Sequence, residues 1–170
     1  MIIKTKKFIF GGGNNSGFIF LEILIAVALV SIVFVTLLGI GALVLNVSSS
    51  IQKQTQADSL VKEEFEAIRN FRDGTTWATD GLGIVNTGSN NPYYLANNAD
   101  KWALVPGTET LGIFTRKVVF DKVSRNASFE IQDTYDPLYD NPDTRKVTVT
   151  VSWADKTLQA VSYFTNWKND

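Results

Sequence analysis

The sequence predicts an α+β fold, in which one long N-terminal helix packs on a small antiparallel sheet. Two observations carry this prediction. Residues 18–45 are almost all Phe, Ile, Leu, Val, Ala and Gly, which indicates a long apolar helix. Residues 144–154 and 157–167 alternate apolar and polar side chains, the pattern of strands with one buried face. We expect a sheet of three or four strands to pack on the continuation of the helix.

Residues 1–17 are expected to form a cytoplasmic leader peptide. Three lysines lie close to Met1, and a run of Gly, Asn and Ser fills residues 11–17. Positive charge beside a membrane span keeps that end in the cytoplasm, so the chain beyond Leu45 is expected to be exported. Gly, Asn and Ser disfavour helix, and we therefore expect an extended backbone that a protease can reach at residues 11–17.

Residues 18–45 are expected to span the membrane. As a helix they would measure roughly 42 Å, enough to cross a hydrocarbon core of roughly 30 Å with some tilt. A conventional secretory signal places its cleavage site after the apolar stretch. Here the Gly17–Phe18 junction precedes it, so that cleavage there would leave the helix attached to the exported domain.

Residues 17–22, Gly-Phe-Ile-Phe-Leu-Glu, resemble the prepilin leader motif that type IV pilins share with type II secretion pseudopilins. The resemblance covers roughly residues 1–70. It implies that a membrane aspartyl protease cuts after Gly17 and methylates the new N-terminus at Phe18. It also implies that Glu22, the fifth mature residue, serves in assembly.

Glu22 is the one charged residue between positions 8 and 52. A carboxylate in an apolar span costs about 3 kcal/mol near the bilayer centre, so a cationic partner is expected. After cleavage the nearest cation is the amine of Phe18, either in the same chain or in a neighbouring subunit, and the resemblance favours the neighbour. The alternative is an interfacial acid on an ordinary signal anchor.

Residues 46–73 are expected to continue the helix as an amphipathic segment that ends near Asp73–Gly74, where Gly can adopt a left-handed cap. We expect its apolar stripe to pack on the sheet, in preference to binding lipid. The stripe consists of Leu60, Val61, Phe65, Ile68 and Phe71.

The exported domain is expected to comprise residues 74–170. Residues 74–112 read as a long irregular connection that contains short strands and is pinned to the core by its aromatic side chains. Strands are predicted at 113–122, 144–154 and 157–167, with a tight turn at Asp155–Lys156 between the last two.

An acidic loop offers a candidate calcium site, because carboxylate oxygens are the ligands that calcium prefers. Asp and Asn are also ordinary turn residues, which leaves a purely structural reading open. The candidate ligands are Asp133, Asp136, Asp140 and Asp143.

The absence of Cys and His excludes thiol nucleophiles, imidazole bases and zinc sites built from those ligands, and we expect no enzyme activity and no required cofactor. The resemblance implies a structural subunit of a type IV pilus or related fibre. Its implied partners are a prepilin peptidase and N-methyltransferase, other pilin subunits, membrane lipid, and an inner-membrane assembly platform with a separate ATPase. Residues 66–73, 146–153 and 165–167 also resemble segments of pilin-like proteins and indicate a minor pilin or a generic prepilin-like protein.

Two further readings stay open. One is a type II secretion pseudopilin; the other is an adhesin or DNA-binding minor pilin displayed on a fibre. In each, a single-pass protein of the inner membrane would move into a periplasmic or cell-surface fibre. The basic residues that could contact DNA are intermingled with acids. They are Lys117, Lys122, Arg125, Arg145 and Lys146.

Overall fold

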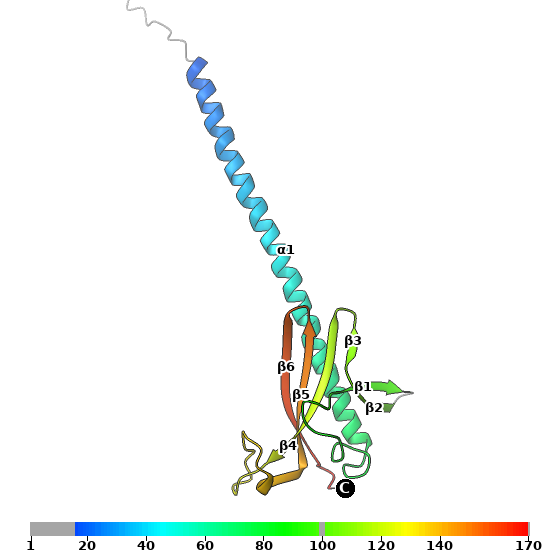
Figure 1. The fold of residues 1–170 in the computed structure, drawn as a ribbon. Helices are drawn as coiled ribbons and strands as arrows, with labels where there is room; N and C mark the ends of the chain where they lie inside the picture. Colours follow the sequence, from blue (N-terminus) through cyan, green and yellow to red (C-terminus); the bar gives the residue numbers. More distant parts are fainter. Residues whose placement is uncertain (1–15, 99–100, 170) are drawn as a thin grey trace, which may run out of the picture. The chain divides into compact units, whose positions relative to one another are not determined.

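The computed structural model describes residues 16–98 and 101–169, and within them one long helix precedes six strands (Figure 1). The chain divides into two units, one that ends at Ser50 and one that starts at Ile51. The elements are α1 (Ser16–Gly74), β1 (Tyr93–Asn98), β2 (Lys101–Pro106), β3 (Glu109–Leu111), β4 (Phe114–Ser124), the 3-10 helix η1 (Pro137–Tyr139), β5 (Asp140–Trp153) and β6 (Lys156–Thr165).

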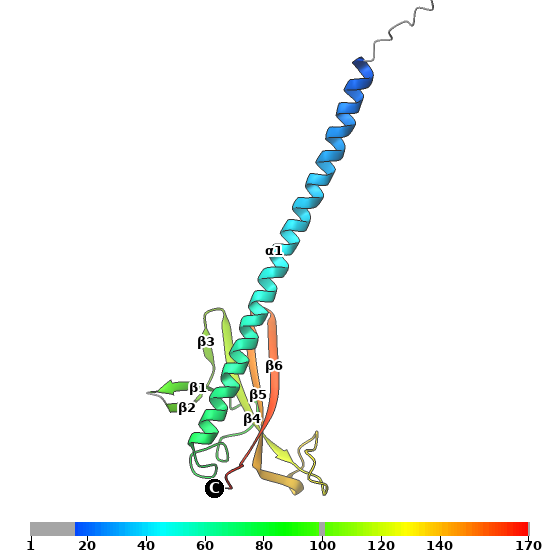
Figure 2. The same ribbon diagram turned by 180° about the vertical axis from the view of Figure 1, so that it is seen from behind.

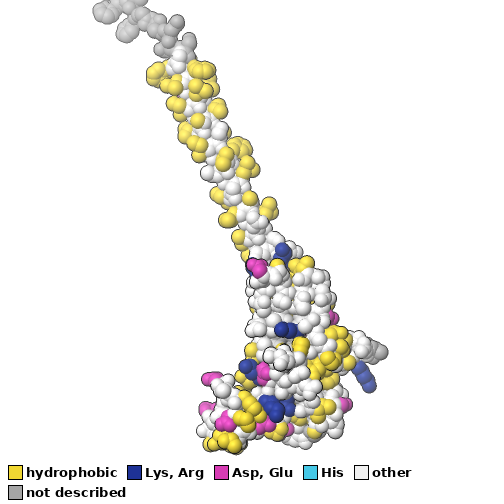
Figure 3. Space-filling view, viewed as in Figure 1, with side chains coloured by type: hydrophobic (Ala, Val, Ile, Leu, Met, Phe, Trp, Pro, Cys, Tyr) yellow, Lys and Arg dark blue, Asp and Glu magenta, His cyan; other side chains and the backbone are white. Residues whose placement is uncertain are grey.

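The part of α1 in the first unit presents apolar side chains all round. Figure 3 shows hydrophobic side chains along its visible face, and Phe18 is 78% exposed. Two hydroxyl groups in the apolar stretch are satisfied inside the helix: Ser31 Oγ donates to the Val27 carbonyl oxygen and Thr36 Oγ1 donates to the Val33 carbonyl oxygen, each at a distance of 2.7 Å. A helix in lipid must satisfy its polar groups internally in this way. By its length and composition, this helix near the N-terminus is long and apolar enough to cross a membrane.

In the second unit, residues 51–74 of α1 pack on one face of the sheet (Figures 1 and 2). Buried positions recur three and four residues apart, which places them on one side of the helix. They are Ala57, Val61, Glu64, Ala67, Ile68 and Phe71. Leu60 and Phe65 are partly buried against the same core, so the predicted stripe packs on the sheet.

The sheet is antiparallel throughout, in the order β2-β1-β4-β5-β6, with β3 also paired to β4. The predicted α+β arrangement, a long helix on an antiparallel sheet, is confirmed. Alternate residues of the central strands face the helix, as the period of two requires. The inward-facing set includes Phe114, Arg116, Val118 and Phe120 of β4 and Val147, Val149, Val151 and Trp153 of β5.

The opposite face of β4, β5 and β6 faces the viewer in Figure 1, and no helix of the described chain crosses it. It is built from cross-strand rows rich in Thr and Val, such as Val119, Thr148 and Val161. Within the described residues β6 is the outer edge of the sheet on this side.

Several details differ from the sequence prediction. The described part of the sheet has six strands instead of three or four, because residues 74–112 contribute β1, β2 and β3. Strand β5 begins at Asp140 instead of residue 144, since Asp140 and Asn141 still pair with β4 across an irregularity that accommodates Pro142. Pro lacks an N–H donor and is tolerated in sheets mainly at such irregularities.

The third difference is the last turn. The turn residues are Ala154 and Asp155, one position earlier than predicted, because Trp153 and Lys156 form the closing pair of the hairpin. Ala154 adopts a φ of 50°, the left-handed conformation that two-residue hairpins require. The sequence carries no Gly or Asn at this position to announce the turn.

Hydrogen bonds from two buried side chains, Trp77 and Arg145, fix the connection after α1. Trp77 Nε1 donates to the Pro142 carbonyl oxygen over 3.0 Å, and Arg145 donates to the carbonyl oxygens of Pro142 and Gly83 over 3.1 and 2.6 Å. A Cβ at Gly83 would lie 2.4 Å from the Trp77 carbonyl oxygen, so this close approach requires glycine. Trp77 therefore pins the connection to the core, as expected for its aromatic residues.

Candidate functional site

The Gly17–Phe18 junction lies in the first turn of α1, which begins at Ser16. The extended backbone expected across residues 11–17 is therefore wrong for residues 16 and 17, and residues 11–15 lie outside the described chain. The long apolar helix that follows extends into these two residues because propagating an existing helix is far easier than nucleating one. Ser is also among the residues favoured at the start of a helix.

Glu22 lies on an apolar face of this first turn and the next two. The residues on that face recur at spacings of three and four. They are Phe18, Leu21, Glu22, Ile25, Ala26 and Leu29. Within the described chain the Glu22 carboxylate forms no ion pair or hydrogen bond. A carboxylate surrounded by such side chains is costly once they are covered by lipid or protein, unless a cation comes with the covering group.

A second cluster of charges lies in the other unit, buried between α1 and the sheet. Glu64 is fully buried, and its Oε1 accepts a hydrogen bond from the backbone N–H of Leu95 over 2.9 Å. Arg116 is 2% exposed and its Nε lies 3.0 Å from Glu64 Oε2. The Arg116 guanidinium also lies 3.4 Å from Glu63 and donates to Glu109. One guanidinium therefore serves three carboxylates.

The hydrogen bonds of Arg116 explain how this cluster links the helix to the sheet. Its Nε donates to Glu109 Oε2 over 3.1 Å, and its Nη1 donates to the Leu60 carbonyl oxygen of α1 over 3.2 Å. The oxygen Glu64 Oε2 is close to Nε but receives no hydrogen bond from it. The contact with Glu64 is thus electrostatic, and Glu109 takes the directed bonds.

Burial raises the pKa of Glu64 from 4.5 to about 7, because loss of hydration outweighs the attraction of Arg116; the nearby Glu109 and Glu63 also raise it. The folded protein thus binds a proton that the unfolded chain releases above its normal pKa. Stability must therefore fall as pH rises between these two pKa values.

We expect the free energy of unfolding to fall by about 1 to 3 kcal/mol between about pH 5 and about pH 8. Glu64→Gln should remove most of this slope, because a neutral amide keeps the acceptor for Leu95 N–H and does not titrate. Urea unfolding of both proteins across this range, followed by tryptophan fluorescence, checks it. Asp73, whose pKa is lowered mainly by its hydrogen bond with Arg72, titrates below the window. Equal slopes in the two proteins would contradict the assignment to Glu64.

Glu64 and Arg116 were not predicted from the sequence as a buried pair, although each carries a visible signal. Glu64 stands between Val61 and Ile68 in the buried helical spacing. Arg116 lies two residues from both Phe114 and Val118 in β4, so its side chain points inward as theirs do. Charged residues at core positions of both elements indicate a buried ion pair.

The four aspartates of the proposed calcium loop have separate surroundings. Asp136 Oδ1 accepts from Leu138 N–H over 3.0 Å at the start of η1, and Asp143 Oδ1 accepts from Asn166 over 3.3 Å. Asp140 pairs with Ser124 at the start of β5, and Asp133 lines a pocket. Among the described residues, no group of three or more acidic side chains is arranged to hold a metal ion. The calcium site stays a prediction of the sequence.

The five basic residues considered for DNA do not share one surface. Arg145 is 5% exposed and donates a hydrogen bond to the Gly83 carbonyl oxygen in the connection after α1. Lys117 alternates with inward-facing Arg116 and Val118, whereas Lys122 and Lys146 line a pocket with two aspartates. A continuous cationic groove, which single-stranded DNA requires, is therefore not formed by these residues.

No known protein-family description, no curated protein and no solved structure matches this chain.

Proposed function

We propose that this chain is a structural subunit of the prepilin type, processed after Gly17, methylated at Phe18 and assembled through its N-terminal helix into a type IV pilus or related fibre. The observation that carries the proposal is the apolar first part of α1 with a single acid, Glu22, on its first turns. The resemblance of residues 17–22 to the prepilin motif supports the cleavage position. A type II secretion pseudopilus is a fibre of the same kind, and the proposal covers both.

Assembly follows from the chemistry of this helix. Residues 18–45 can leave a bilayer only if other apolar surface replaces the lipid, and identical helices of neighbouring subunits supply it. The carboxylate of Glu22 would then pair with the free amine of Phe18 in the adjacent subunit. Such a pair neutralises both charges and fixes the register of the stack.

The proposal implies its partners and location. A prepilin peptidase and N-methyltransferase would act on the cytoplasmic side, and the C-terminal domain would be exported from the inner membrane. The motor would be a separate ATPase on an assembly platform, because the sequence has no Gly-Lys-Ser/Thr phosphate loop. The chain itself would be a building block and not an enzyme.

The direct test is the N-terminus and mass of the full chain after membrane expression with and without a prepilin peptidase. We expect peptidase-dependent release of residues 1–17 and N-methylation of Phe18. Gly17→Ala should reduce processing strongly, because the added Cβ changes the residue that the protease must accommodate.

Gly41→Ala is the matched control, since it makes the same change inside the apolar helix and should be processed normally. An uncleaved Met1 in the presence of active peptidase, or cleavage beyond residue 45, would overturn the proposal. The first outcome would leave a signal anchor and the second a secreted domain.

A further inference from the structure

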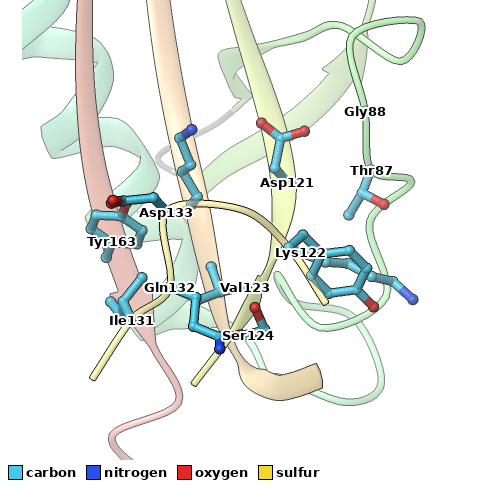
Figure 4. A pocket seen from close by; sticks show the side chains of 12 residues that line it. Thr87, Gly88, Asp121, Lys122, Val123, Ser124, Ile131, Gln132, Asp133 and Tyr163 are labelled. Carbon is cyan, nitrogen blue, oxygen red and sulfur yellow. The ribbon is translucent and has the colours of Figure 1, made fainter. Parts of the chain in front are cut away.

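A pocket of about 340 Å³ opens in the second unit beside the last residues of β4 (Figure 4). It lies on the side of the sheet opposite α1. Asp121, Lys146 and Tyr163, which line it, are directly opposite one another across β4, β5 and β6. Their neighbours Phe120 and Val147 point the other way, into the core. The pocket is thus separate from the helix surface and from the buried Arg116 cluster.

The walls of this pocket are fixed by backbone hydrogen bonds. Gly88 N–H donates to the Phe120 carbonyl oxygen over 2.8 Å and holds one wall against β4. On the other side, Gln132 N–H donates to the Ser124 carbonyl oxygen over 2.9 Å, and Asp136 N–H donates to Ser124 Oγ over 3.1 Å. A pocket held by such contacts is formed before any ligand arrives, which lowers the entropy cost of binding.

Four charged side chains that line the pocket are not used by the protein. The side chains of Asp121, Lys122, Asp133 and Lys146 form no ion pair or hydrogen bond within the described chain. Two carboxylates and two ammonium groups balance in charge, so the pocket does not favour a strongly charged ligand of either sign. They supply several acceptors and donors at close range, a set that matches hydroxyl groups.

Gln132 provides the most specific signal. Its Oε1 is buried and accepts no hydrogen bond from the described protein. A buried acceptor without a donor is costly, and native proteins rarely tolerate one without a reason. Figure 4 shows the Gln132 side chain among the pocket residues. The protein covers this oxygen, so a ligand hydroxyl would reach it after a rotation of the Gln132 side chain, and the hydrogen bond formed in this way would remove the cost.

Tyr163 adds an apolar surface at the rim. Its side chain is 46% exposed, and Figure 4 shows it beside Asp133. An aromatic ring next to a carboxylate offers a flat face for C–H groups and an acceptor for hydroxyls at the same time. A pyranose ring presents both kinds of group on one small body.

From these observations we propose that the pocket binds one uncharged sugar ring, as a terminal residue of a glycan. Gln132 Oε1 and the two aspartates accept from sugar hydroxyls, Lys122 and Lys146 donate to them, and Tyr163 packs on one face of the ring. The volume suits one ring and not a longer chain, so that further residues of a glycan would extend into solvent. This inference goes beyond fibre assembly and does not depend on it.

The experiment uses the full chain in phospholipid nanodiscs, because glycoside detergents would compete for the pocket. Saturation-transfer difference NMR is recorded with the methyl glycosides of glucose, galactose, mannose and N-acetylglucosamine, and with L-alanine as a zwitterion of similar polarity. We expect transfer to at least one glycoside with millimolar affinity and none to L-alanine.

Gln132→Leu should weaken binding about tenfold, the loss typical of one hydrogen bond. Gln159→Leu is the matched control, because Gln159 belongs to β6 but does not line the pocket, and it should bind normally. Tyr163→Ala should also abolish transfer, whereas Tyr163→Phe should keep it, and this second pair carries the test if Gln132→Leu does not fold. The proposal is overturned if no glycoside shows transfer or if L-alanine alone does. It is also overturned if Gln132→Leu and Tyr163→Ala both bind the glycoside with wild-type affinity.

Discussion

Replacing Arg116 with Met is expected to lower the free energy of unfolding of the second unit by about 3 to 5 kcal/mol at neutral pH, the usual cost of removing one partner of a buried ion pair. Glu64 is fully buried and would lose Arg116, the one cation that pairs with it among the described residues, while the Leu60 carbonyl oxygen would lose a donor. Urea unfolding of the full chain, followed by tryptophan fluorescence, measures the change. The loss should be smaller at acidic pH, because Glu64 can then be protonated.

Two further variants identify the cause of this loss. Arg69→Met removes an exposed ion pair with Glu66 on the same helix and should cost less than about 1 kcal/mol. Arg116→Met combined with Glu64→Leu removes both buried charges, leaves only the more exposed Glu63 and Glu109 without their partner, and should recover much of the stability. A double variant that is as unstable as the sum of the single changes would show that packing, and not the isolated carboxylate, causes the loss.

Glu22→Leu is expected to leave membrane insertion and cleavage after Gly17 intact but to reduce fibre assembly about 100-fold or more. In this variant the proposed subunit contact would bury the Phe18 amine of the neighbouring subunit, and the Glu22 carboxylate that should pair with this amine would be absent. Leaving one buried charge unpaired costs about 3 to 5 kcal/mol, which corresponds to at least 100-fold in an association constant. Insertion itself should become easier, because the apolar span loses a charge worth about 3 kcal/mol.

The measurement is the amount of subunit in fibres sheared from cells, compared with the amount of processed subunit in the membrane. Ser31→Leu is the control, since Ser31 lies in the same helix and its hydroxyl is satisfied by the Val27 carbonyl oxygen. It makes the helix more apolar without removing a charge and should assemble normally. Wild-type fibre yield from Glu22→Leu would show that this carboxylate has no part in assembly.

The sequence allowed prediction of those parts whose local pattern is strong. The apolar composition of residues 18–45 and the alternation in β5 each extend over many residues, so one exception does not obscure them. The corresponding alternation in β4 places Arg116 on the inward face of that strand. Strands β1 and β3 have only 6 and 3 residues, too few for a period of two to stand out in a loop-rich segment.

The partners of the buried charges could not be predicted for a different reason. Glu64 meets Leu95 at a separation of 31 residues, and Arg116 meets Leu60 at 56. Such pairs depend on which strand lies under which turn of the helix, and the order β2-β1-β4-β5-β6 places β1 beside β4 although two strands separate them in sequence. The pocket at Gln132 likewise combines a loop with the ends of strands.

Strand β6 has a further consequence for the behaviour of this protein in solution. As the outer strand of the described sheet it presents one open backbone edge, and Lys156 is its one charged residue. Proteins usually protect such edges with several charges, a proline or a bulge, because an open edge accepts a strand from another molecule. Concentrated samples therefore carry a risk of edge-to-edge aggregation that rests on backbone pairing and is independent of the apolar helix.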